Sequence, residues 1–120
     1  MASTADLIVD AVRGFEREVP ALAKLKLVIR LELRGRGDVQ VFRVGVPGPE
    51  VSKGEPDHAR VEISVPRSHF NELAADGRLA HWRDAYEHGH VRVGGDPEIV
   101  KLVGTVIERQ EARARLRKAR

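Results

Sequence analysis

Hydrophobic and polar residues alternate with different periods along the chain, and each period predicts one kind of element. Apolar residues at helical spacing predict a helix over 4–19, which Pro20 ends. Strict alternation predicts a strand over 25–33 with one buried face, followed by a turn and a returning strand over 39–46. The returning strand alternates imperfectly, which a β-bulge or the burial of both faces would explain.

The second half of the chain contains shorter segments of the same two kinds. A poorly patterned strand is expected around Val51, and a clearly alternating strand over 58–65. Two short helices follow, one that Pro66 opens and Gly77 closes, and one over about 79–88.

A brief strand over 90–95 leads into the last helix, for which Asp96 is a good N-cap and Pro97 a good first residue. Gly104 inside this helix costs about 1 kcal/mol relative to alanine, which indicates that it permits a close approach by another segment. Consecutive strands joined by short turns favour antiparallel pairing. The order of elements predicts an α+β fold, with a five-stranded, mostly antiparallel sheet and helices packed on one face.

Positive charge is concentrated at the C-terminal end. The 120 residues carry a net charge of +3, yet residues 109–120 hold six basic residues and one acidic residue, which leaves −2 for residues 1–108. We expect one domain over 1–108 and a basic helix end or tail over 109–120. A solvated tail is favoured, because no aromatic residue lies among the arginines to stack on bases. Binding of nucleic acid or anionic lipid through the tail remains an alternative.

Catalytic chemistry is not indicated by any motif. The chain has no cysteine, no nucleophile elbow of the Gly-x-Ser-x-Gly type and no glycine-rich phosphate loop. Ser68 and His69 are neighbours on a predicted helix, where adjacent side chains point apart and form no dyad. We predict no catalytic residue, no cofactor and no enzymatic activity of the chain alone.

Several histidines lie close together in the sequence. His81, Asp84 and His88 would share one face of a helix, with His90 nearby, and such a set could ligate zinc. An exposed polar face opposite Trp82 explains the same spacing without a metal. We therefore predict no metal site.

Signals for export or membrane insertion are not found in the sequence. The N-terminal segment carries Asp6 and Asp10 and lacks the basic start and apolar run of a signal peptide. No stretch of about 18 apolar residues is present, and the lack of cysteine suits a reducing compartment. The sequence predicts a cytoplasmic protein with no transmembrane segment.

Residues 59–107 contain a series of motifs that resembles the second half of the sterol carrier protein 2 domain. An alternating strand precedes two short helices that each end in glycine, then a strand of the Val-x-Val-x-Gly-Asp type and a last amphipathic helix. The matching positions are Val61, Ile63, Phe70, Leu73, Gly77, Leu79, Ala85, Gly89, Val91, Val93, Gly95, Asp96 and Leu102. The first half of the chain agrees in outline, with one helix and then a hairpin.

This resemblance implies an apolar tunnel between sheet and helices that takes a fatty acyl chain, acyl-CoA, phospholipid or sterol-like molecule. The last helix would be its movable cover, and the protein a lipid carrier or an accessory module that partners a protein of lipid metabolism. The peroxisomal signal of animal members is missing and arginine outnumbers lysine, which points to a bacterial member. The expected lining residues are Phe70, Leu73, Leu79, Trp82, Val91, Val93, Ile99, Leu102, Val103 and Val106.

The same apolar positions would also form a filled core. A domain of this size gains stability by filling its interior, and an empty cavity costs about 24 cal/mol per Å³. A structural or interaction module without a ligand is therefore the alternative function.

Overall fold

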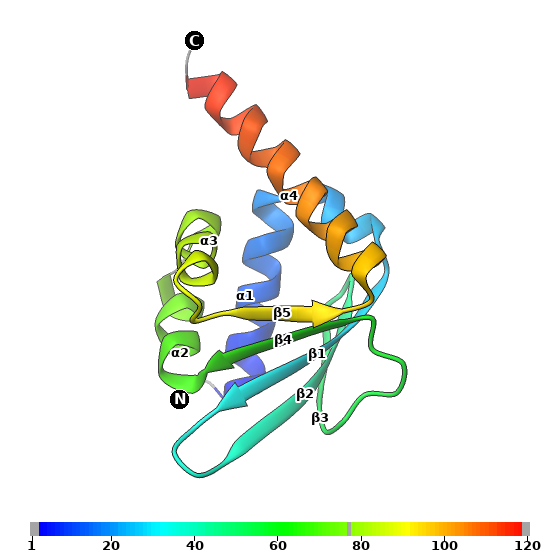
Figure 1. Cartoon of the computed structure of the whole chain (residues 1–120), viewed down its shortest axis with the longest axis vertical. Helices are drawn as coiled ribbons and strands as arrows, with labels where there is room; N and C mark the ends of the chain where they lie inside the picture. The colour runs from blue at the N-terminus through cyan, green and yellow to red at the C-terminus, as the bar shows by residue number, and fades with distance from the viewer. Residues whose placement is uncertain (1–2, 77, 119–120) are drawn as a thin grey trace.

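The computed structural model describes residues 3–76 and 78–118, so the predicted helix stop at Gly77 and the last two residues lie outside the described residues. Helices and strands follow the expected order, with one unexpected 3₁₀ turn, η1, after the first helix (Figure 1). Pro20 ends the first helix as expected, and it also begins this turn. The elements are α1 (Thr4–Glu18), η1 (Pro20–Lys24), β1 (Leu27–Arg34), β2 (Val39–Val46), β3 (Glu50–Lys53), β4 (Val61–Pro66), α2 (Arg67–Asp76), α3 (Leu79–Glu87), β5 (Arg92–Gly95) and α4 (Pro97–Lys118).

The strands of the described residues form one five-stranded sheet with the order β3-β2-β1-β4-β5. Antiparallel pairing joins β1 to β2, β2 to β3 and β4 to β5, whereas β1 and β4 are parallel. The predicted α+β class is confirmed, but the sheet is mixed. The parallel pair arises because the link after β3 carries the chain back across the sheet to the free edge of β1.

The predicted hairpin of β1 and β2 has an unbroken register over the full length of both strands. Phe42 and Val44 of β2 are buried on the inner face, whereas Val39 on the outer face is 53% exposed. The imperfect alternation of β2 therefore reflects apolar residues on the outer face of a regular strand, and not a bulge.

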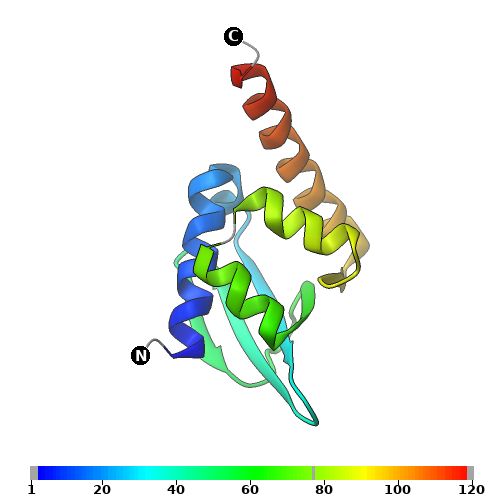
Figure 2. The same cartoon turned by 90° about the vertical axis from the view of Figure 1, so that its left-hand side faces the viewer.

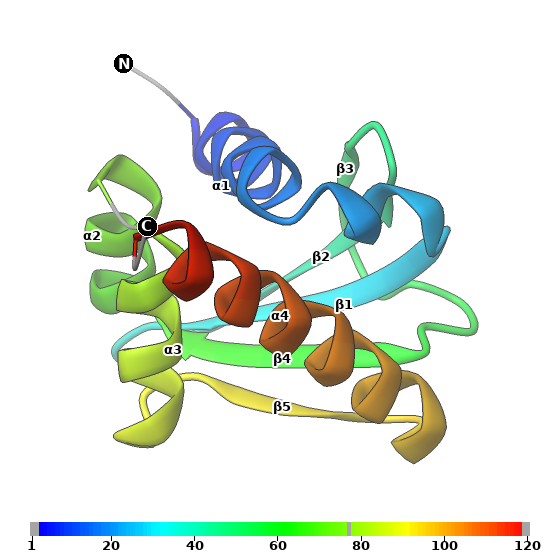
Figure 3. The ribbon, with the colours of Figure 1, turned by 90° about the horizontal axis from the view of Figure 1, so that it is seen from above.

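The hydrophobic core lies between the inner face of the sheet and the helices, which cover that face alone (Figures 1 and 3). Ser3 caps α1, since its side chain accepts from the backbone N–H of Asp6, and the apolar stripe of α1 then faces the sheet. The buried cluster consists of Ile8, Leu31, Leu33, Phe42, Val44, Val46, Val65, Phe70, Ala85 and Val91.

Helix α4 contacts β5 and η1 near its N-terminal end and then continues beyond the body, which gives the molecule extents of 48 × 28 × 26 Å (Figure 2). The close approach expected at Gly104 is wrong, because a methyl group placed there would meet no other segment of the described residues within 4 Å. In the part of the chain that the structure describes, no helix is long and apolar enough to cross a membrane.

Candidate functional site

The junction between β5 and α4 fixes where the last helix starts. Gly95 has a φ of +114°, and a Cβ there would collide with the backbone carbonyl oxygen of Arg60. The backbone N–H of Asp96 donates to that same oxygen at 2.9 Å. Its side chain accepts from the N–H of Glu98 at 3.0 Å and so caps α4 as predicted. The start of α4 is therefore tied to the segment before β4.

The inner face of the sheet is not fully covered near β5. Val93 pairs with Ile63, and paired residues of antiparallel strands project to the same face, so Val93 points to the helix-covered side. Val61 and Val65, on that face of β4, are 3% and 0% exposed, whereas Val93 is 38% exposed. The cover formed by α3 and α4 therefore leaves apolar surface of β5 open to solvent.

On the side of α4 that faces α3, an ion pair joins the two helices at Glu111, whereas there is open space at Gly104. Glu111 of α4 accepts from Arg83 of α3, whose Nε lies 2.9 Å from both carboxylate oxygens and whose Nη2 lies 2.5 Å from Oε1. Gly104 is seven residues earlier, so it lies on the same face, two turns nearer β5. A Cβ at Gly104 would face open space, with no atom of another described segment within 4 Å. An ion pair thus joins the two helices above an open region.

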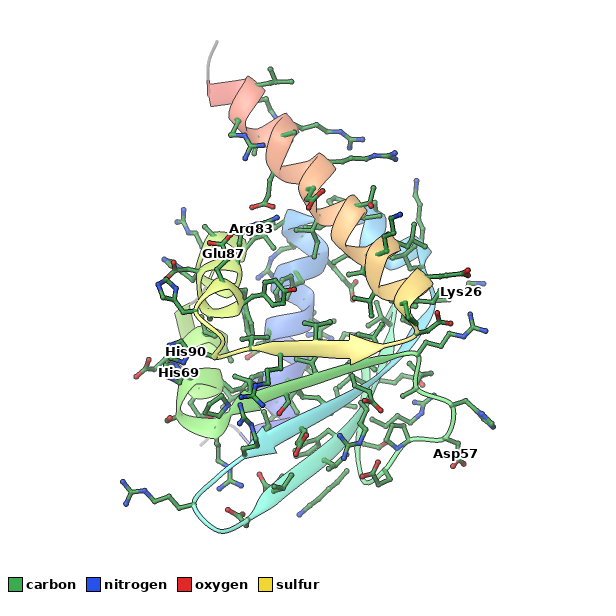
Figure 4. The ribbon with its side chains drawn as sticks, in the orientation of Figure 1. Lys26, Asp57, His69, Arg83, Glu87 and His90 are labelled. Atoms are coloured by element: carbon green, nitrogen blue, oxygen red, sulfur yellow. The ribbon has the colours of Figure 1, made fainter. Side chains whose placement is uncertain are left out.

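The Arg83–Glu111 pair is partly shielded from water, with side-chain exposures of 37% and 19%. The hydrogen bonds to Glu111 raise the pKa of Arg83 above its ordinary value, so the guanidinium stays charged at every physiological pH. A weaker contact within α3 joins the same arginine to Glu87 at 3.6 Å (Figure 4). The pair provides a fixed link between the cover helices.

A separate groove of about 370 Å³ lies between α1, α2 and α3. Its apolar lining consists of Leu7, Ala11, Phe15, Leu73, Ala74, Ala75, Leu79 and Trp82. The Trp82 ring lies 5.2 Å from that of Phe15 and 6.1 Å from that of Phe70, between centroids. At the rim, Glu18 accepts from the N–H of Leu79 at 2.6 Å, which attaches α3 to α1. Asp10, Arg17 and Glu18 also line the groove, so its walls combine apolar and charged groups.

The predicted lining residues fall into separate places. Leu73, Leu79 and Trp82 line the groove against α1. Phe70 and Val91 are buried in the core. The predicted residues of α4 differ in exposure: Ile99, Val103 and Val106 are half-buried, whereas Leu102 is exposed. Val93 is exposed on the helix-covered face of β5.

Sequence reasoning missed the contribution of the first helix to the groove. Leu7, Ala11 and Phe15 lie at helical spacing, so the stripe itself was visible as a buried face. The spacing does not show that two short helices pack against this stripe and leave a groove.

The histidines line a second, shallower groove of about 470 Å³ between α2 and α3. The rings of His69 and His90 stack with centroids 4.2 Å apart (Figure 4). The Nδ1 of His81 accepts from the N–H of Arg78 at 2.9 Å, and the Nδ1 of His88 lies 2.8 Å from the carbonyl oxygen of Asp84. The Nδ1 atoms of His81 and His88 are therefore both in contact with the backbone.

These backbone contacts of His81 and His88 argue against a zinc site at the histidines. Within residues 3–76 and 78–118, no group of three or more histidine or acidic side chains is arranged to hold a metal ion. The hydrogen bond to the Asp84 carbonyl, aided by the Asp84 carboxylate, raises the pKa of His88. A higher pKa favours the imidazolium, which cannot bind a metal.

No protein-family model matches the sequence, and no curated protein matches it. Solved structures do match. The palmitated SCP2L2 of Aedes aegypti aligns at 18% identity over 88% of this chain and 95% of that chain, with a TM-score of 0.63. The sterol carrier protein domain 2 of Helicoverpa armigera aligns at 9% identity over 87% and 84%, with a TM-score of 0.59. A ubiquinone synthesis protein, UbiJ-SCP2, aligns at 14% identity over 85% and 91%, with a TM-score of 0.50.

The described elements define a small α+β domain in which helices cover one face of a mixed five-stranded sheet. The solved structures share this arrangement over nearly their whole length. The chain therefore has the fold of the sterol carrier protein 2-like domains, and the resemblance predicted from the sequence is confirmed for the fold.

Proposed function

We propose that this protein binds one apolar molecule, such as a fatty acyl chain, under α4 and carries it without chemical change. Two observations support the proposal: Val93, on the helix-covered face of β5, is 38% exposed, and the α3-facing side of α4 has open space at Gly104. An acyl chain placed there would contact β5 from one side and α4 from the other. Val93 and the half-buried residues Ile99, Val103 and Val106 of α4 would form its surroundings.

The energetics of burial support an elongated apolar ligand. Each buried CH₂ contributes about 0.8 kcal/mol, so about eight of them supply roughly 6 kcal/mol before the cost of immobilising the chain. The solved relative from Aedes aegypti is described as palmitated, which fits this ligand class. A carrier of this kind would act in the cytoplasm and exchange its ligand with a lipid-metabolising partner protein.

Titration with a fluorescent fatty acid tests the proposal, with Gly104→Leu as the decisive variant. The leucine would occupy the empty space beside α4, so we expect saturable one-to-one binding by the natural chain and at least about tenfold weaker binding by the variant. Ala114→Leu is the matched control, because it adds the same side chain at an exposed position of the same helix. It should bind as the natural chain does.

A third variant separates the two apolar regions. Ala74→Leu fills the groove between α1, α2 and α3 and leaves the α4 region untouched. Loss of binding in Ala74→Leu with normal binding in Gly104→Leu would place the ligand beside Trp82 and contradict the proposed site. If native mass spectrometry across a panel of acyl chains detects no complex, the carrier function is refuted and a ligand-free interaction module takes its place.

A further inference from the structure

The C-terminal half of α4, residues 109–118, is a basic arm that extends away from the body (Figure 2). Arg109, Arg113, Arg115 and Arg117 are all exposed. Among the described residues, none of these four forms an ion pair. The acidic residue of the arm, Glu111, is bound to Arg83 of α3. The arm therefore presents positive charge that nothing in the described part of the molecule neutralises.

The exposed face of the arm combines this charge with leucine. Arg109, Arg113 and Arg117 follow one another at four-residue spacing, so they lie on one side of the helix. Leu116, which is 68% exposed, and Leu102, which is 44% exposed, lie seven residues on either side of Arg109 and share its stripe. At an anionic surface the arginines would supply electrostatic attraction, and the exposed leucines beside them would add apolar contact.

We propose that this stripe of α4 docks on the surface of an anionic phospholipid membrane. The arginines would pair with headgroup phosphates and carboxylates, while Leu116 and Leu102 would enter the boundary between headgroups and acyl chains. Duplex nucleic acid would also pair with the arginines, but it would leave both leucines in water. The membrane therefore accounts for more of the exposed surface.

The rest of the molecule favours one orientation of this docking. Residues 1–108 carry a net charge of −2, so an anionic surface attracts the arm and repels the body. The arm leaves the body on the helix-covered side of the sheet (Figure 1). The docking rests on the exposed stripe of α4 and does not require that the body bind a ligand.

Cosedimentation with vesicles, in the absence of any fatty acid, tests the proposal. We expect binding to phosphatidylcholine vesicles that contain phosphatidylserine, weak binding to phosphatidylcholine alone, and release as salt rises from about 0.1 to 0.5 M. The triple variant Arg109→Gln, Arg113→Gln, Arg117→Gln should bind about 100-fold more weakly, since each arginine near the surface contributes about fivefold. Leu116→Gln should weaken binding about five- to tenfold.

A matched control removes the same charge from the body. The triple variant Lys24→Gln, Arg36→Gln, Lys53→Gln changes three exposed basic residues outside the arm and should bind at least as tightly as the natural chain. Equal losses in the two triple variants would overturn the proposal, because net charge alone would then explain binding. Arm-dependent binding to duplex DNA that exceeds vesicle binding and is unchanged in Leu116→Gln would overturn it in favour of nucleic acid.

Discussion

At the residue scale, two glycines of the β5–α4 unit have opposite surroundings. Gly95 combines a positive φ with backbone contacts, since a Cβ would lie 3.0 Å from the carbonyl carbon of Arg60 and 3.1 Å from the Cα of Val61. Gly104 lies in a regular helix beside empty space. The first glycine is required by geometry, whereas the second weakens the helix and keeps a space free.

Alanine substitution at the two glycines should therefore change stability in opposite directions. We expect Gly95→Ala to lower the free energy of unfolding by at least about 2 kcal/mol, because the residue becomes strained and displaces the start of α4. Gly104→Ala should raise it by about 1 kcal/mol through helix propensity. Urea denaturation measures both, as shifts of the midpoint at constant slope. A loss of stability in Gly104→Ala would mean that the space beside it is filled.

At the scale of elements, the Arg83–Glu111 pair holds α4 to α3 beyond the open region. An exposed ion pair contributes about 0–1 kcal/mol, and this one is bidentate and half-shielded, so its effect is expected to be local. Breaking it frees the far end of α4 without removing the contacts of α4 with β5 and η1. The pair therefore controls how readily the cover separates from α3.

Hydrogen exchange measures this control in the variant Glu111→Gln. We expect the amides of residues 104–112 to exchange about three- to fivefold faster, with a change in global stability below about 1 kcal/mol. Glu87→Gln is the matched control, because it removes the contact of the same arginine within α3 and should leave exchange in α4 unchanged. Unchanged exchange in Glu111→Gln would show that the pair does not hold α4.

Also at the scale of elements, the sequence predicts which face of an element is buried more reliably than it predicts which neighbour that face contacts. Alternation located the hairpin and β4, and the Asp96–Pro97 pair located the start of α4, because these signals are local. The parallel pairing of β1 and β4 was not predicted, since alternation does not specify a neighbour. Gly104 was misread because a helical glycine is compatible with both a close contact and an empty space, and only the position of α3 decides between them.

At the scale of the whole molecule, the candidate site depends on the sheet and the cover helices being folded together. Val93 comes from β5, Gly104 from α4 and Arg83 from α3, and the pairing of β5 with β4 joins them to the core. The unfolded chain offers no such surface. An apolar ligand bound under α4 should therefore stabilise the fold as a unit, in proportion to its occupancy.

Thermal unfolding with and without a fatty acid tests this coupling. At a free ligand concentration about 100 times Kd, binding stabilises the folded state by about 2.7 kcal/mol, which corresponds to a rise in Tm of roughly 10 °C for a domain of this size. Gly104→Leu should lose most of this rise, and Ala114→Leu should keep it. A fatty acid that binds by fluorescence but leaves Tm unchanged would have to attach equally to folded and unfolded chains. That result would exclude a site built jointly from β5, α3 and α4, because such a site exists only when all three elements are in place.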